Sequence, residues 1–165
     1  MYWPTFLSCT DVDHVGTVRA SLITFAAVQA AKPDLIIYVG IAGEFKRKGV
    51  KVGDIFLVIE TANHDMRIRI GNFVGYGIGP LVATPAPNLV KELALKEGKV
   101  STGNSLEITP KDEEMILAND ASLKDMEGVH LKSHEAQIWP QQVQLLSNGC
   151  KLYSQYLVIG NVWKF

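Results

Sequence analysis

The stretch LIIYVG, residues 35–40, decides the fold, because it is a continuous apolar run that ends at a glycine. A short run of this kind predicts a β-strand that is buried on both faces, as in parallel sheets. Residues 15–31 precede it with apolar side chains at helical spacing, and Pro33 ends that pattern. The apolar positions of this expected helix are Val18, Leu22, Phe25 and Ala26. A helix followed by a buried strand predicts an α/β fold, in which residues 40–44 form the loop that leaves the strand.

The same alternation continues along the chain. Further strands are expected over 53–61, 99–102, 121–126 and 157–159, and further helices over 87–96 and 109–119. Gly98 is expected to close the first of these helices, and Thr109 to cap the second with Pro110 at its first position. The segment 63–87 is rich in Gly and Pro, which predicts a long irregular loop of the functional or interface type.

Strands that alternate with helices predict a mostly parallel sheet, and ligand sites in such sheets lie at the carboxyl ends of the strands. The expected chemistry therefore lies in the loops that follow Val39, Thr61, Thr102 and Met126.

The composition of the 165 residues excludes several classes of protein. With 47% hydrophobic residues the chain is too apolar to be intrinsically disordered. Sixteen Lys and Arg against seventeen Asp and Glu give no basic excess, which argues against a nucleic-acid partner. Cys9 and Cys150 cannot form a disulfide framework. Residues 1–10 lack a signal-peptide pattern, and no apolar run is long enough for a membrane, so we expect one soluble, cytoplasmic domain.

Three groups of residues are candidates for chemistry. Glu127 stands at a strand end before a glycine, where a carboxylate can accept hydrogen bonds from a sugar diol; a helix-start carboxylate or a solvated loop residue fits the same pattern. Gly40 and Gly43 would let the backbone approach a ligand closely, although a tight turn needs them equally. His64 and Asp65 could handle a proton together, but neighbours on an extended chain point to opposite sides, so a histidine held by local hydrogen bonds is the alternative.

No metal or cofactor site is predicted. His130 and His134 lie four residues apart, a spacing that can bind a metal on a helix, but no Glu lies between them in the pattern that such sites use.

Several segments, in order along the chain, resemble the plant-type 5′-methylthioadenosine/S-adenosylhomocysteine nucleosidases of the nucleoside phosphorylase superfamily. They are VGTVRAS at 15–21, VGDIFLV at 52–58, STGNSL at 101–106 and NDASLKDMEG at 119–128. The resemblance covers about residues 11–128, which we interpret as an incomplete nucleoside phosphorylase-like domain, and leaves 129–165 as a divergent tail. It implies a three-layer α/β/α sandwich around a mixed, mostly parallel sheet, a homodimer, and hydrolysis of methylthioadenosine to adenine and methylthioribose in methionine salvage, without a cofactor.

The resemblance also implies roles for individual residues. Glu127 matches the glutamate that holds the ribose hydroxyls, and Met126 matches the methionine that packs on the sugar. Matches to the rest of the nucleoside pocket are Leu106, Ser105 and Glu107 at the purine, and Gly40, Ile41 and Gly43 beside the nucleoside. Ile41 replaces a Ser or Thr of the family, and Glu44 replaces a glycine. This pair argues against a phosphate site and hence against a phosphorylase.

The two catalytic carboxylates of the family have no match. The glutamate that activates water belongs to a strand before this chain begins, and residues 129–165 contain Glu135 but no segment like that of the general acid. The resemblance therefore predicts an impaired nucleosidase, with a non-catalytic nucleoside-binding or storage-type relative as the alternative.

Overall fold

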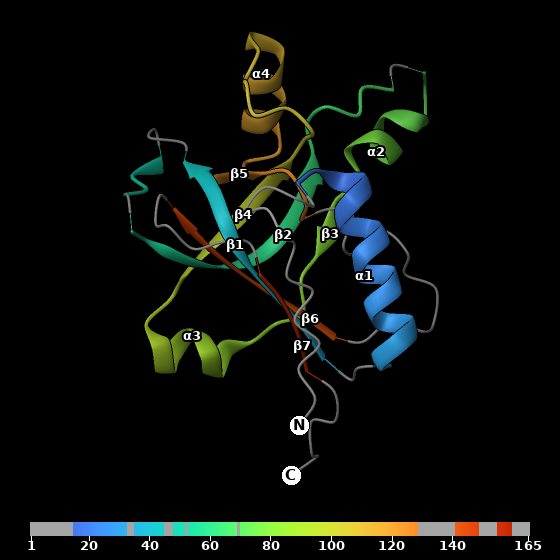
Figure 1. Ribbon diagram of the computed structural model, residues 1–165. Coiled ribbons are helices and arrows are strands. Elements are labelled where there is room, and N and C mark those ends of the chain that lie inside the picture. Colours follow the sequence, from blue (N-terminus) through green and yellow to red (C-terminus); the bar gives the residue numbers. More distant parts are fainter. Residues whose placement is uncertain are drawn as a thin grey trace.

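A mixed β-sheet with helices on either side forms the centre of the protein. The computed structural model describes residues 15–32, 35–44, 48–51, 53–68, 70–128, 141–148 and 155–159. The helices are α1 (Thr17–Ala31), α2 (Phe73–Ile78), α3 (Pro87–Leu93) and α4 (Pro110–Ala118). The strands are β1 (Leu35–Glu44), β2 (Ile55–Asn63), β3 (Leu81–Val82), β4 (Lys96–Thr102), β5 (Leu123–Asp125), β6 (Gln141–Asn148) and β7 (Gln155–Ile159). In the view of Figure 1, α1 stands to one side of the strands and α3 to the other.

The strands pair in the order β3-β2-β4-β5-β1-β6, with β7 also on β1. The two longest ladders, β1 with β6 and β2 with β4, are parallel. A further pairing of β2 with β6 joins the sheet back on itself. The predicted α/β class with a mixed sheet is confirmed.

Strand β1 is longer than its sequence predicts. Residues 40–44 were expected to form a loop, but they continue the strand to Glu44, so that prediction is wrong. Gly40 pairs with Leu146 of β6, and Gly43 pairs with Lys124 of β5. Pairing with strands that are distant in sequence thus outweighs the low strand preference of glycine.

The boundary between α3 and β4 also differs from its prediction. The helix ends at Leu93, and Ala94 adopts a left-handed conformation with φ 49°. Gly98 does not close a helix but lies inside β4, where a Cβ atom would come within 2.9 Å of the Phe56 ring. Close packing against that ring, rather than helix termination, explains the glycine. The segment 63–87, expected to be irregular, contains α2 and β3.

The N-terminus of α4 follows its prediction. Thr109 Oγ1 accepts a hydrogen bond from Asp112 N at 3.2 Å, and Asp112 Oδ2 accepts one from Thr109 N at 2.9 Å. This reciprocal capping box satisfies two backbone donors that the helix itself leaves unpaired.

Helix α1 packs with its small side chains toward the sheet. Ala20, Ala27 and Val28 are buried, whereas the larger apolar side chains at Val18 and Leu22 are exposed. The apolar spacing therefore predicts the helix correctly but does not mark the face that packs.

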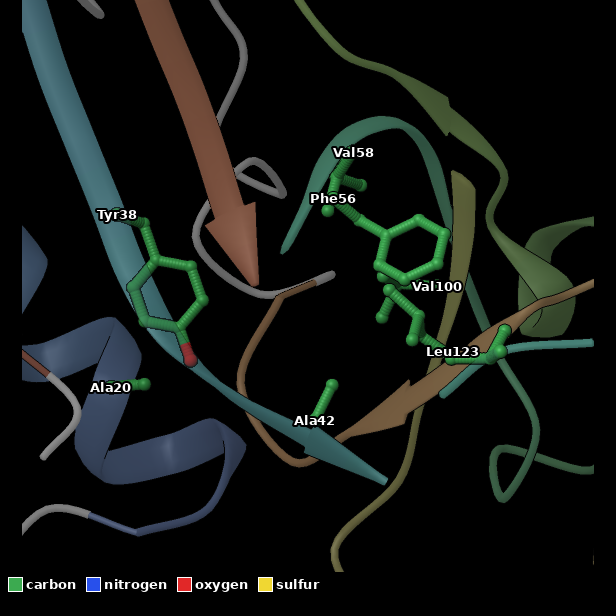
Figure 2. Packing of buried hydrophobic residues seen from close by; sticks show 8 residues of the cluster. Ala20, Tyr38, Ala42, Phe56, Val58, Val100 and Leu123 are labelled. Atoms are coloured by element: carbon green, nitrogen blue, oxygen red, sulfur yellow. The ribbon is translucent and has the colours of Figure 1, made fainter. Parts of the chain in front are cut away.

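The main apolar core lies between β1, β2, β4 and β5, with Ala20 contributed by α1 (Figure 2). Figure 2 shows Phe56, Val58, Val100 and Leu123 gathered together, and Tyr38 facing Ala20. The Tyr38 ring is buried in this core, and its hydroxyl reaches the Glu127 carboxylate beyond the end of β5. No helix of the described residues is long and apolar enough to cross a membrane.

Candidate functional site

Three strand ends and one helix start meet around Glu127. β4 and β5 run parallel, with Thr102 paired with Asp125, and Gly103 N donates to the Asp125 carbonyl at 3.2 Å. β5 pairs with β1 at Gly43, and the turn after β5 brings Glu127 to the start of α1. The structure therefore gathers candidate residues at this edge, as expected for an α/β sheet.

Glu127 is a buried carboxylate, with 7% of its surface exposed. Its Oε1 accepts a hydrogen bond from Gly16 N, the N-cap of α1, at 3.0 Å. Its Oε2 accepts from the Tyr38 hydroxyl at 3.3 Å and from Met126 N at 3.2 Å. A solvated loop position is thereby excluded. The carboxylate does lie at a helix start, that of α1, where its charge is favourable to the helix dipole.

The loop after β4 is joined to α1 and to the segment that follows β2 by Asn104. Its Oδ1 accepts hydrogen bonds from Thr17 N at 3.0 Å and from Thr17 Oγ1 at 2.8 Å. Its backbone N donates to Asp65 Oδ2 at 2.7 Å. Sequence reasoning assigned no role to Asn104 or Thr17, although both lie in the segments that resemble the nucleosidases.

The segment predicted to line a purine pocket is exposed, and its backbone is held by a buried cation. Leu106 is 83% exposed, and Ser105 and Glu107 are exposed as well. Lys124, which lies on β5, donates from Nζ to the Ser105 carbonyl and, at 3.4 Å, to the Leu106 carbonyl. Burial lowers the pKa of the Lys124 ammonium group. The main chain of 105–106 is thus anchored while its side chains are exposed.

The glycine candidates lie within β1 rather than in a loop. Gly40 is buried, Gly43 is exposed, and Ile41 between them is 39% exposed. A Cβ atom on Gly43 would lie 3.8 Å from the Lys124 carbonyl oxygen, an ordinary contact. Their place beside a nucleoside stays a prediction, as does the contact of half-buried Met126 with a sugar.

His64 and Asp65 have different hydrogen-bond partners. The His64 ring is buried and its Nδ1 lies 3.2 Å from Ser101 Oγ, whereas Asp65 accepts from Asn104. Burial lowers the pKa of His64, which favours the neutral ring. The ring packs directly on Gly103, where a Cβ atom would lie 2.3 Å from its Nε2. The alternative of a histidine held by local hydrogen bonds is not met either, because Ser101 is 37 residues further along the chain.

Asp125 is the most perturbed acid near Glu127, and sequence reasoning did not single it out. Its Oδ1 accepts from Thr102 Oγ1 at 2.6 Å and its Oδ2 from Gly128 N at 2.8 Å. Burial raises the pKa of this carboxyl group to about 7.

Within the described residues no cluster of three or more His, Cys, Asp or Glu side chains is arranged to hold a metal ion. His130, His134, Glu135, Cys9 and Cys150 lie outside the described residues.

Comparison with known proteins shows which family this chain belongs to. The model of the phosphorylase superfamily matches residues 3–132. A 5′-methylthioadenosine nucleosidase of Arabidopsis thaliana is 57% identical over 117 residues, which are 71% of this chain and 44% of that protein. A 5′-methylthioadenosine/S-adenosylhomocysteine nucleosidase of the same plant is 51% identical over 121 residues, or 73% of this chain and 48% of the relative.

Solved structures agree with this similarity. The apo form of Arabidopsis thaliana 5′-methylthioadenosine nucleosidase superimposes with a TM-score of 0.79 at 51% identity, covering 82% of this chain and 56% of that one. A crystal structure of an MTA/SAH nucleosidase gives 0.80 at 43% identity, covering 88% and 59%. The chain thus spans just under half the length of the two curated relatives.

Proposed function

The chain belongs to the phosphorylase superfamily, and on this basis we propose that it is a nucleosidase-type hydrolase that cleaves the N-glycosidic bond of 5′-methylthioadenosine to adenine and methylthioribose. The observation that carries the proposal is the buried Glu127 carboxylate at the meeting point of β1, β4, β5 and α1. A carboxylate with both oxygens directed to hydrogen-bond donors is suited to bind the two neighbouring hydroxyls of a ribose.

The proposed binding mode uses Glu127 for the 2′- and 3′-hydroxyls of the sugar. Oε1 accepts one hydrogen bond and Oε2 accepts two, so one ribose hydroxyl can bind Oε1 beside Gly16 N, and a second takes the place of one of the longer bonds to Oε2. Cleavage of a glycosidic bond passes through an oxocarbenium-like sugar. A negative charge held beside that sugar stabilises the positive charge as it develops.

The remaining candidate residues are proposed to surround the sugar and the base of the nucleoside bound at Glu127. Met126 packs on the sugar, and the main chain near Ser105, Leu106 and Glu107 faces the purine. Gly40, Ile41 and Gly43 of β1 lie beside the nucleoside. All of these residues fall within 11–128, which we propose as the nucleoside-binding unit, although the backbones of β6 and β7 join the same sheet. No general acid or base is assigned.

Adenine release from 5′-methylthioadenosine, followed by a coupled absorbance assay on the purified protein, tests the proposal. Glu127→Gln is expected to lower turnover by about 10²-fold or more, because it removes the charge beside the developing cation. The matched control is Glu92→Gln on exposed α3, which should leave turnover unchanged. Equal turnover in wild type and Glu127→Gln contradicts the role of Glu127, and nucleoside binding without any turnover favours the non-catalytic alternative.

We also propose that the protein is a cytoplasmic homodimer of methionine salvage, with residues 63–80 at the dimer face. Ile70, Phe73 and Tyr76 are exposed by 71%, 59% and 72%. Large apolar side chains gathered on one exposed segment are typical of protein interfaces. Light scattering coupled to size-exclusion chromatography should give a dimer mass for wild type and a monomer mass for Tyr76→Glu, with exposed Leu93→Glu on α3 as control. A monomeric wild type contradicts the assignment.

A further inference from the structure

Asp125 joins the end of β4 to the turn that carries Glu127. The residue is 3% exposed, and its carboxyl group accepts hydrogen bonds from two segments. Oδ1 accepts from the Thr102 hydroxyl on β4, and Oδ2 accepts from the backbone N of Gly128. One side chain therefore links a sheet strand to the last residue of the turn 125–128.

The turn closes tightly on this carboxyl group. A Cβ atom on Gly128 would lie 2.6 Å from Asp125 Oδ2, closer than real Cβ atoms approach. The main chain of Asp125 is fixed as well, because its carbonyl accepts from Gly103 N. Both ends of the turn are thus held, and Glu127 lies between them.

We propose that Asp125 is a positioning residue, whose carboxyl group holds the turn 125–128 so that Glu127 presents its carboxylate at the point where Gly16, Tyr38 and a bound sugar can reach it. The inference rests on the proposed function, since it concerns the residue assigned to the ribose hydroxyls. Asp125 itself touches no substrate in this scheme. Its effect on binding passes through the orientation of Glu127.

The protonation of Asp125 suggests a conservative replacement. Burial and the nearby Glu127 carboxylate raise the pKa of Asp125 to about 7, so a neutral side chain is compatible with the site. An asparagine can accept from Gly128 N with its carbonyl oxygen and donate to Thr102 Oγ1 with its amide group. An alanine removes both hydrogen bonds. Asp125→Asn should therefore retain the turn and Asp125→Ala should release it.

Isothermal titration with two probes tests this role. One probe is a C-nucleoside analogue of 5′-methylthioadenosine, whose base is joined to the sugar by a carbon–carbon bond that is not hydrolysed. The other is adenine, which has no sugar. Asp125→Ala is expected to weaken binding of the nucleoside by about tenfold and to leave adenine binding unchanged, whereas Asp125→Asn stays near wild type.

A double-mutant cycle separates positioning from a direct contribution. If Asp125 acts through Glu127, Asp125→Ala should add nothing to Glu127→Gln. If Asp125→Ala does not fold, Thr102→Val provides the test, because it removes the hydrogen bond to Asp125 Oδ1 at nearly constant volume. Thr102→Val should weaken binding of the nucleoside and leave binding of adenine unchanged.

Different results refute different proposals. Equal weakening of both probes, or multiplicative losses in the cycle, overturns the positioning role and leaves Asp125 a general structural residue. The same conclusion follows if Glu127→Gln weakens nucleoside binding but neither Asp125→Ala nor Thr102→Val does. If Glu127→Gln itself binds both probes like wild type, the ribose site of the proposed function fails instead.

Discussion

At the residue scale, the buried acid Asp125 makes the stability of the protein depend on pH in an unusual direction. Most paired carboxylates have lowered pKa values and stabilise a protein as the pH rises. The pKa of Asp125 is raised to about 7, so the folded protein keeps this proton over a range in which the unfolded chain releases it. The folded state then binds more protons than the unfolded state, and its stability falls with rising pH.

This effect gives a prediction that involves no ligand. From pH about 4, the ordinary pKa of an aspartate, to pH about 7, wild type should lose stability relative to Asp125→Asn, and above pH 7 the difference should stay constant. Urea unfolding of both proteins at several pH values measures the difference. A difference that does not change between pH 4 and 7 contradicts the raised pKa.

Gly103 provides a second prediction at this scale. A Cβ atom there would overlap the buried His64 ring, with Nε2 at 2.3 Å and Cε1 at 2.6 Å. Gly103→Ala should therefore destabilise the protein by about 1–3 kcal/mol, as overpacking does in other cores. Gly75→Ala in exposed α2 meets no atom within 4 Å and is the control, expected to be neutral or slightly stabilising. Equal free energies of unfolding for the two variants would show that the His64 ring can move aside.

Several residues near Glu127 acquire their roles through contacts between segments that are distant in sequence. The sequence indicates Glu127 as a carboxylate at a strand end, but its partner Gly16 is far away along the chain, and no local pattern joins the two. Asn104, Thr17 and Asp125 acquire their roles only when distant segments meet, so spacing arguments do not find them.

At the element scale, features with local causes are predicted well. The start of α4 is correct to the residue because its capping box lies within four residues of sequence. The end of β1 and the start of β4 are not, because they depend on pairing with strands distant in sequence: β1 continues along β6 and β5, and β4 begins early along β2. In α1 the spacing of the apolar residues predicts a helix correctly. The larger apolar side chains of this helix are nevertheless exposed, and its alanines Ala20 and Ala27 are buried.

The capping box at the start of α4 is expected to contribute measurably to the stability of the protein. Thr109→Ala removes the hydroxyl that accepts from Asp112 N and should lower the free energy of unfolding by about 1 kcal/mol. Thr84→Ala, at a half-buried position outside the helices and strands, is the matched control and should change it less. Thermal melts of the two variants beside wild type measure the effect. If Thr109→Ala and Thr84→Ala have the same melting temperature, the hydroxyl of Thr109 contributes no more to stability than that of Thr84.

At the scale of the whole molecule, the order in which strands are synthesised differs from the order in which they pair. β1 comes early, yet Ile37 pairs with Val143 on one side and with Leu157 on the other. A fold built from contacts of such high sequence separation forms slowly, since long chain segments must be closed before the contacts are gained. During translation, the apolar run LIIYV therefore leaves the ribosome long before its partners do. The nascent chain should need protection by a chaperone until β6 and β7 have emerged.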